Sequence, residues 1–95
     1  MIYDYASIEN LLHNARRLGI EETLTGRKNE ELTFLNRCLS LLEPHEKDIV
    51  NKTYVEGVSM RKYSSFSGFS RNFIAKTRRQ TVELLVRFFN LKFAE

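Results

Sequence analysis

Six basic side chains lie between Ser59 and Gln80, a segment that contains no acidic residue. They are Arg61, Lys62, Arg71, Lys76, Arg78 and Arg79. The segment has a formal charge of +6 and the whole chain +3, so the other residues sum to −3. A basic block in an otherwise acidic chain is typical of a surface that binds nucleic-acid phosphates. Charge alone leaves an alternative open, in which these residues are ordinary solvated faces of a helical protein.

The spacing of the residues after Ser70 separates a polar face from an apolar one. An apolar stripe at helical steps, which we expect to be buried, consists of Ile74, Thr77, Thr81, Leu85 and Phe88, with Leu84 alongside. The opposite side carries Asn72, Ala75, Lys76 and Arg79, with Arg71 at its N-terminal shoulder. In the major groove arginine suits guanine and asparagine suits adenine, and a small alanine lets the backbone come close. This pattern predicts a helix that reads base edges from its first two turns.

The predicted DNA-binding residues fall into two groups. Phosphate contacts are expected from Arg61, Lys62, Arg78 and the backbone beside the cap residue Ser70. Base contacts are expected from Arg71, Asn72, Lys76 and Arg79.

Capping and turn residues divide this half of the chain into three helices. Pro44 is tolerated in the first turn of a helix, and Gly57 is suited to ending that helix. Ser59 is expected to cap a short helix from Met60 to Phe66. A turn of Ser67, Gly68 and Phe69 follows, and Ser70 caps the long last helix. A three-residue turn is the length that a helix-turn-helix uses.

Residues 41–91 resemble region 4 of primary bacterial sigma factors and of the phage regulators that share it. The residues that stand in the places of the family pattern are Leu42, Pro44, Ile49, Tyr54, Gly57, Ser59, Tyr63, Gly68, Phe69, Ser70 and Ile74. Two positions depart from the pattern. Ser67 replaces a usual core leucine, with Phe66 one place early, which leaves the length of the second helix open. Phe73 replaces a common polar recognition residue, and we favour packing there over a contact with a thymine methyl group.

The resemblance implies a transcription regulator similar to phage late-gene activators of the ArpU and RinA types, with RNA polymerase as a further partner. At 95 residues we do not expect a complete sigma factor, because the chain has no room for the promoter-melting region.

The N-terminal half, residues 1–42, is predicted to form two helices. Ser7 or Asp4 caps the first, and Gly19 is its expected end; its apolar stripe is Ile8, Leu11, Leu12, Ala15 and Leu18. A polar connection centred on Thr25 and Gly26 leads to a second helix that begins at Arg27 or Asn29 and ends at Leu42. The broad apolar face of that helix contains Leu32, Leu35, Leu39 and Leu42, widened by Phe34, Cys38 and Leu41.

This broad face is either entirely internal core, which we favour, or partly a homodimer seam. The C-terminal aromatic tail, with Phe88, Phe89, Leu91 and Phe93, should likewise pack on the first two helices or on a second subunit. We therefore expect an all-α protein, because helix formers dominate and no run of residues alternates as a strand does. The N-terminal pair, residues 1–42, and the helix-turn-helix segment, residues 43–95, should together form one small domain.

The sequence offers no convincing catalytic, metal or cofactor site. His13 and His45 are far apart and lack a partner ligand at helical spacing. The single cysteine, Cys38, allows no internal disulfide and fits a reducing cytoplasm. No apolar stretch of membrane-spanning length and no signal peptide is present. We therefore expect a cytoplasmic, non-enzymatic protein.

The leading hypothesis is a sequence-specific regulator that binds double-stranded DNA and is encoded by a phage or mobile element. One alternative is a protein-interaction module that binds RNA polymerase or another phage protein, because a fold does not fix a function. A second alternative is a DNA binder for packaging, similar to a small terminase subunit. An adaptor would be expected to bury aromatic residues such as Phe66 and Phe73 in its partner, whereas a DNA reader needs the basic face free.

Overall fold

All regular secondary structure in the described part of the chain is helical. The computed structural model describes residues 3–20 and 27–93. Its elements are α1 (Tyr5–Ile20), α2 (Arg27–Ser40), α3 (Pro44–Val50), the π-helical segment η1 (Asn51–Val55), α4 (Met60–Ser67) and α5 (Arg71–Lys92). No strand occurs within these ranges. The predicted all-α fold is therefore confirmed.

Two serines and two glycines set the helix boundaries around α4 as the sequence predicts. The Ser59 hydroxyl accepts a hydrogen bond from Lys62 N–H at 3.1 Å, and Ser70 accepts one from Phe73 N–H at the same distance. These bonds satisfy amide groups that have no partner inside their helices. Gly57 and Gly68 both adopt positive φ, +75° and +84°, which a side chain disfavours.

The helix predicted from Met60 to Phe66 is one residue longer than expected. Ser67 is the last residue of α4, so the link to α5 consists of Gly68, Phe69 and Ser70. The Ser67 hydroxyl accepts a hydrogen bond from Phe69 N–H at 3.2 Å, which places this serine in the helix end instead of the turn.

The predicted helix from Pro44 to Gly57 changes its winding halfway. Regular α-helix ends at Val50, and η1 follows with wider turns. Glu56 N–H donates to Asn51 C=O at 2.9 Å, a bond that spans five residues instead of four. The wider turn brings Thr53 and Tyr54 into the core side by side, where Thr53 donates its hydroxyl hydrogen to Ile49 C=O at 2.6 Å.

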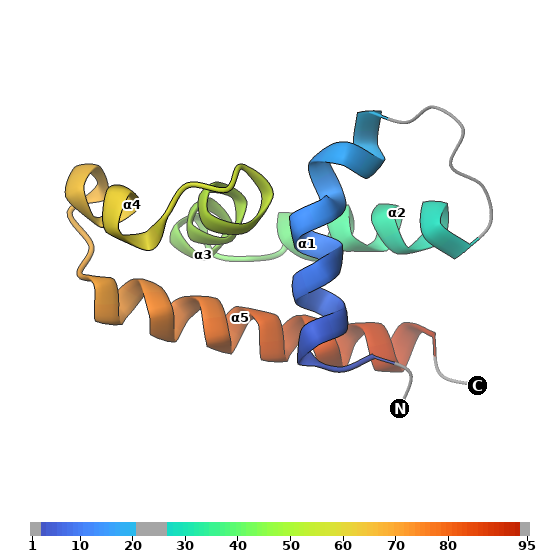
Figure 1. Cartoon of the computed structure of the whole chain (residues 1–95). Helices are drawn as coiled ribbons and strands as arrows, with labels where there is room; N and C mark the ends of the chain where they lie inside the picture. Colours follow the sequence, from blue (N-terminus) through green and yellow to red (C-terminus); the bar gives the residue numbers. More distant parts are fainter. Residues whose placement is uncertain (1–2, 21–26, 94–95) are drawn as a thin grey trace.

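Two groups of buried side chains hold the helices together. The smaller one joins Ile49 of α3, Tyr63 of α4 and Ile74 of α5. The larger one draws on α1, α2, α3, η1 and α5 and contains Tyr3, Ile8, Leu12, Leu35, Cys38, Val50, Tyr54, Val82, Leu85 and Phe89. Figure 1 shows α5 running beneath the other helices, with α3 and α4 over its N-terminal part and α1 and α2 over its C-terminal part.

This division of α5 corrects the predicted stripe. Ile74, Thr77, Thr81 and Leu85 are buried as expected, but Phe88 is only half-buried. Val82 and Phe89, which the stripe omits, are buried in its place. The reason is that α1 and α2 cover the C-terminal part of α5 from a different side than α3 covers its N-terminal part.

Several boundaries in the N-terminal half also differ from the prediction. Asp4, and not Ser7, caps α1: its carboxylate accepts a hydrogen bond from Ser7 N–H at 2.8 Å. Gly19 does not end α1, which continues to Ile20. Because α2 ends at Ser40 instead of Leu42, Leu41 lies in a turn and is 79% exposed instead of buried. The connection at Thr25 and Gly26 and the side chain of Leu18 lie outside the described residues.

The C-terminal tail follows its prediction in part. Phe89 is buried, and Phe93 packs half-buried against the same cluster, whereas Leu91 is 79% exposed. Tyr3, to which the sequence assigned no role, is buried against this end of α5. Its amide N–H donates to Asn90 Oδ1, and Asn90 Nδ2 donates back to Tyr3 C=O, each at 2.9 Å. In the described ranges, no helix has the length and apolar character needed to cross a membrane.

Candidate nucleic-acid interface

The free face of α5 carries the residues that the sequence assigned to base contacts. Arg71, Asn72, Lys76 and Arg79 are all exposed, as is the small Ala75 among them. On the far side of the same turns, Ile74 is buried with Ile49 of α3 and Tyr63 of α4, and Thr77 is buried as well. The packed side of the helix therefore fixes the direction in which the polar side points.

The first turn of α4 places two further cations beside this face. Arg61 and Lys62 are exposed, while Met60 before them is half-buried. Met60 and Ala75 line the same cleft, so the start of α4 lies next to the free face of α5. The Ser70 cap is exposed at the start of α5, where unpaired helix amides favour anions. Seven of the eight residues predicted to bind DNA are therefore exposed at or near one end of the molecule.

One of the exposed cations has an acidic neighbour. Arg79 Nε lies 3.8 Å from Glu83 Oε1, one helical turn away, and both side chains are more than half exposed. An exposed pair of this kind is worth little, so the ion pair leaves Arg79 available to a stronger anion.

Arg78 is the exception among the predicted residues. Its guanidinium carbon lies 4.1 Å from the centroid of the Tyr54 ring, and the residue is half-buried. Its Nε atom is buried without a hydrogen-bond partner. Stacking on a tyrosine face is a packing interaction that joins α5 to η1. The geometry thus gives Arg78 a structural contact that the sequence prediction of a phosphate contact did not include.

Tyr54 connects this contact to α1. Its hydroxyl donates to Glu9 Oε2 at 2.8 Å, and its ring lies edge-on to His13. Burial and, to a smaller extent, the hydrogen bond to Glu9 raise the pKa of Tyr54 well above its ordinary value. A cleft of about 220 Å³ opens beside this group and is lined by Tyr5, Glu9, Tyr54, Met60, Ala75 and Arg78. The cleft holds one carboxylate and one guanidinium, which gives it no charge preference of its own.

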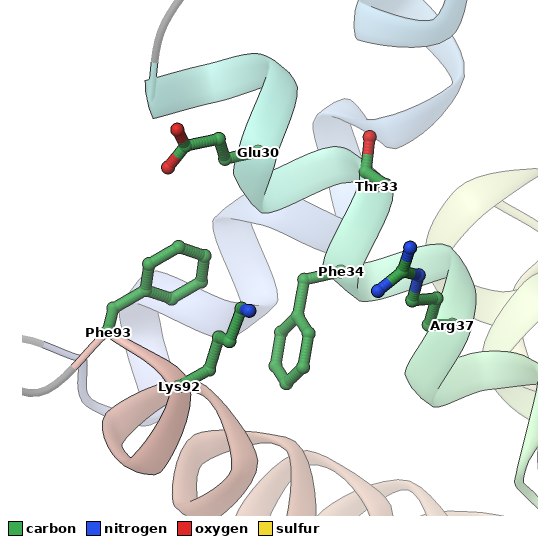
Figure 2. Close-up of a pocket in the computed structure, with 6 residues that line it drawn as sticks. All are labelled: Glu30, Thr33, Phe34, Arg37, Lys92 and Phe93. Atoms are coloured by element: carbon green, nitrogen blue, oxygen red, sulfur yellow. The ribbon is translucent and has the colours of Figure 1, made fainter.

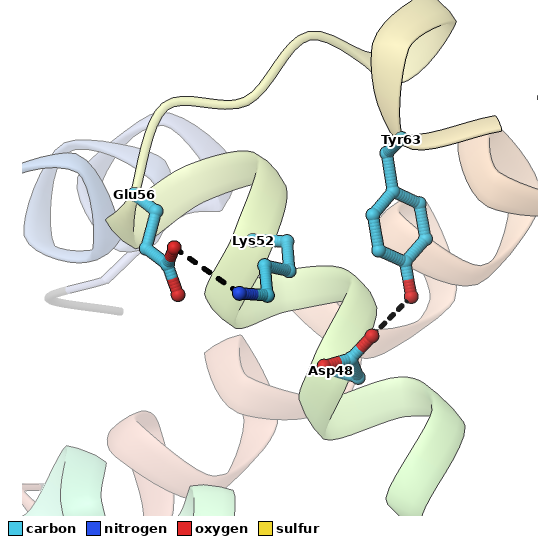
Figure 3. A network of polar contacts seen from close by, with 4 residues as sticks. All are labelled: Asp48, Lys52, Glu56 and Tyr63. Atoms are coloured by element: carbon cyan, nitrogen blue, oxygen red, sulfur yellow. Dashed lines mark hydrogen bonds and ion pairs between the residues drawn. The ribbon is translucent and has the colours of Figure 1, made fainter. Parts of the chain in front are cut away.

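A second tyrosine holds α4 to α3. The Tyr63 hydroxyl donates to the carboxylate of Asp48, as Figure 3 shows. Burial of the ring and then the bond to Asp48 raise the pKa of Tyr63 to about 12. In the same view Lys52 Nζ lies 3.3 Å from Glu56 Oε1, an exposed pair along η1. The Tyr63–Asp48 contact fixes the orientation of α4 on α3. The positions of Arg61 and Lys62 depend on this orientation, because both residues lie in the first turn of α4.

Two aromatic rings, one on α4 and one on α5, are partly exposed to solvent. Phe73, in the first turn of α5, is 40% exposed, and Phe66 at the end of α4 is 58% exposed. The Phe73 ring centroid lies 5.1 Å from that of Phe69 and 5.9 Å from that of His45. The sequence leaves two roles open for Phe73: packing, which we favour, and a contact with the methyl group of thymine. In the structure the ring packs on one side and faces solvent with the rest.

A groove at the opposite end of the molecule has a different character. It has a volume of about 350 Å³ and is lined by Glu30, Thr33, Phe34 and Arg37 of α2, by Lys92 of α5 and by Phe93 directly after it. Figure 2 shows the Lys92 side chain between the rings of Phe93 and Phe34, with Glu30 and Arg37 on the neighbouring helix α2. Within the described residues, no three histidine, cysteine, aspartate or glutamate side chains gather as metal ligands would.

No family model, curated protein or solved structure matches this chain.

Proposed function

We propose that this protein is a sequence-specific DNA-binding regulator of transcription and that α5 enters the major groove with its free face. The single observation that carries the proposal is the division of α5. Asn72, Lys76 and Arg79 point away from the fold, while Ile74 and Thr77 on the same two turns anchor the helix. A reading helix requires this combination of a fixed back and a free polar front.

The surrounding elements support the same function. The three-residue link between α4 and α5 has the length of a helix-turn-helix turn. Arg61 and Lys62 are exposed in the first turn of α4, directly after Met60, which lines a cleft together with Ala75 of the free face. Cations in this place suit contacts with a duplex backbone. The resemblance to sigma region 4 adds the expectation of a phage-encoded regulator that also contacts RNA polymerase.

The experiment has two steps. DNA fragments are first selected from a random duplex pool by the full chain, at two salt concentrations. The Lys76→Ala/Arg79→Ala variant is then measured on the selected site. We expect it to lose specific binding with unchanged helical circular dichroism. If both side chains contact phosphates in part, the slope of log affinity against log salt should also fall by up to about 2.

A matched control removes the same charge from the same helix. Arg87 and Lys92 are exposed near the C-terminal end of α5, away from its first two turns. The Arg87→Ala/Lys92→Ala variant should keep the site preference, with at most a small uniform loss of affinity. Equal losses in the two double variants would show non-specific attraction to the overall charge. An unchanged preference in Lys76→Ala/Arg79→Ala would show that the reading face is wrongly assigned.

The main alternative is a protein-interaction module, which the exposed Phe66 and Phe73 favour. Large exposed aromatic rings are typical of residues that anchor protein interfaces. Under that alternative Phe66→Ala abolishes binding to a partner such as RNA polymerase, and no duplex is selected. A packaging role similar to that of a small terminase subunit predicts a steep salt dependence without a consensus sequence.

Self-association through the N-terminal helices or the C-terminal aromatic residues stays a prediction. The 79% exposed Leu91 is the apolar side chain that a second copy would cover at that end. Light scattering of the free protein and of its complex with the selected duplex measures the number of copies directly.

A further inference from the structure

Phe73 occupies a position that would face a bound duplex. It lies in the first turn of α5, directly after the exposed Asn72 and three residues before the exposed Lys76. The ring is 40% exposed, although a large aromatic side chain gains free energy from complete burial. It therefore presents a fixed apolar surface within a face that is otherwise polar and basic.

The ring is held from behind by two neighbours. Phe69, in the link before α5, and His45, in the first turn of α3, lie 5.1 Å and 5.9 Å from it between ring centroids. These contacts restrict the rotation of the Phe73 side chain before anything binds. A side chain that is already ordered loses little conformational entropy on contact with a ligand.

The chemistry of the ring limits what it recognises on DNA. A phenyl ring donates no hydrogen bond and carries no charge, so it has no favourable contact with a phosphate group. In the major groove the group that suits an apolar side chain is the C5-methyl group of thymine. Neighbouring Asn72 and Lys76 supply the hydrogen bonds that polar base edges require.

We propose that Phe73 is a specificity-determining residue that selects thymine at one position of the DNA site through contact with its methyl group. This inference rests on the proposed function, because it requires α5 to lie in the major groove. Phe66 is not assigned this role, because it lies at the end of α4 and packs edge-on against Tyr63 instead of standing in the first turn of α5.

The test removes single methyl groups from the DNA. In the duplex selected by the full-length wild-type chain, each thymine is replaced in turn by uracil, which keeps every hydrogen-bonding group. We expect one position at which the wild type loses about fourfold in affinity, the factor equivalent to ~0.8 kcal/mol for one buried methyl group. The Phe73→Ala variant should bind the thymine and uracil forms of that position equally.

Two further variants complete the design. Phe73→Leu keeps an apolar side chain and should retain part of the preference for thymine. Phe66→Ala removes the other exposed ring and should retain the whole preference. Helical circular dichroism shows whether each variant is folded, and the uracil series with the wild type requires no variant at all.

The outcomes separate the two proposals. If no duplex is selected, the proposed function fails and this inference fails with it. If a site is selected but no uracil substitution weakens binding, or Phe73→Ala keeps the full preference for thymine, the inference is overturned while DNA binding stands.

Discussion

The guanidinium carbon of Arg78 lies 4.1 Å from the centre of the Tyr54 ring, and this contact joins the middle of α5 to η1. Through the Tyr54 hydroxyl the connection continues to Glu9 on α1. Two helices that precede α5 in the chain thereby fix one side of it. The neighbouring Arg79 makes an exposed pair with Glu83, so adjacent arginines have different roles.

Replacing Arg78 by alanine should lower the free energy of unfolding by about 1–2 kcal/mol, because the variant loses a partly desolvated stacking contact. Arg78→Lys should lower it less, since the charge stays but the planar group is lost. Arg79→Ala, the matched control, should change it by less than about 0.5 kcal/mol. Urea denaturation followed by circular dichroism measures all three. Equal effects at the two arginines would contradict the structural role of Arg78.

Gly68 should be sensitive to any side chain. Its φ of +84° is disfavoured for other residues, yet a Cβ atom there would meet nothing within 4 Å. Gly68→Ala should therefore cost about 1–2 kcal/mol through backbone strain alone. Gly68→Asn should cost less, because asparagine tolerates this conformation better. If thermal unfolding shows that both variants are as stable as the wild type, the left-handed conformation at Gly68 does not make glycine necessary for stability.

Burial separates two leucines of α5. Leu85 is fully buried, whereas Leu91 is 79% exposed. Leu85→Ala should lower the free energy of unfolding by about 2–5 kcal/mol, as for other buried large-to-small changes. Leu91→Ala should change it by less than about 0.5 kcal/mol in the monomer. A large loss at Leu91 that grows with protein concentration would instead indicate that a second copy covers it.

Alkaline pH should weaken the contact between α3 and α4. The pKa of Tyr63 is raised from its ordinary 10.0 to about 12, so the folded state holds this proton more tightly than the unfolded state. The resulting stabilisation is complete below pH 10 and is lost as the pH rises through about 12. The urea midpoint of the wild type should fall more steeply above pH 10 than that of Tyr63→Phe. Parallel curves for the two proteins would rule out this contribution.

Local signals in the sequence predicted much of the fold. Ser59 and Ser70 cap their helices because a hydroxyl satisfies free amides wherever it stands before a helix. Helical spacing placed Ile74, Thr77 and Thr81 inside and Asn72, Lys76 and Arg79 outside. Helix caps and helical spacing both depend on residues that are close together in the chain. They can therefore be recognised in a single sequence.

The features that the sequence did not predict depend on distant parts of the chain. Arg78 looks like a surface cation until Tyr54 is placed beneath it. Phe89 replaces Phe88 in the core because of the direction from which α2 approaches. The change of winding at Asn51 coincides with the burial of the adjacent Thr53 and Tyr54, and no local residue pattern marks it.

The two reciprocal hydrogen bonds between Tyr3 and Asn90 tie the start of the chain to the end of α5. This connection matters for any attempt to produce the proposed DNA-binding half alone. A fragment that began at residue 43 would retain every residue of the basic face. It would nevertheless expose Val82, Leu85 and Phe89 to water along the greater part of one helix side. We therefore expect amide hydrogen exchange at the end of α5 to be fast in the fragment and slow in the whole chain, because residues before position 43 cover this part of the helix.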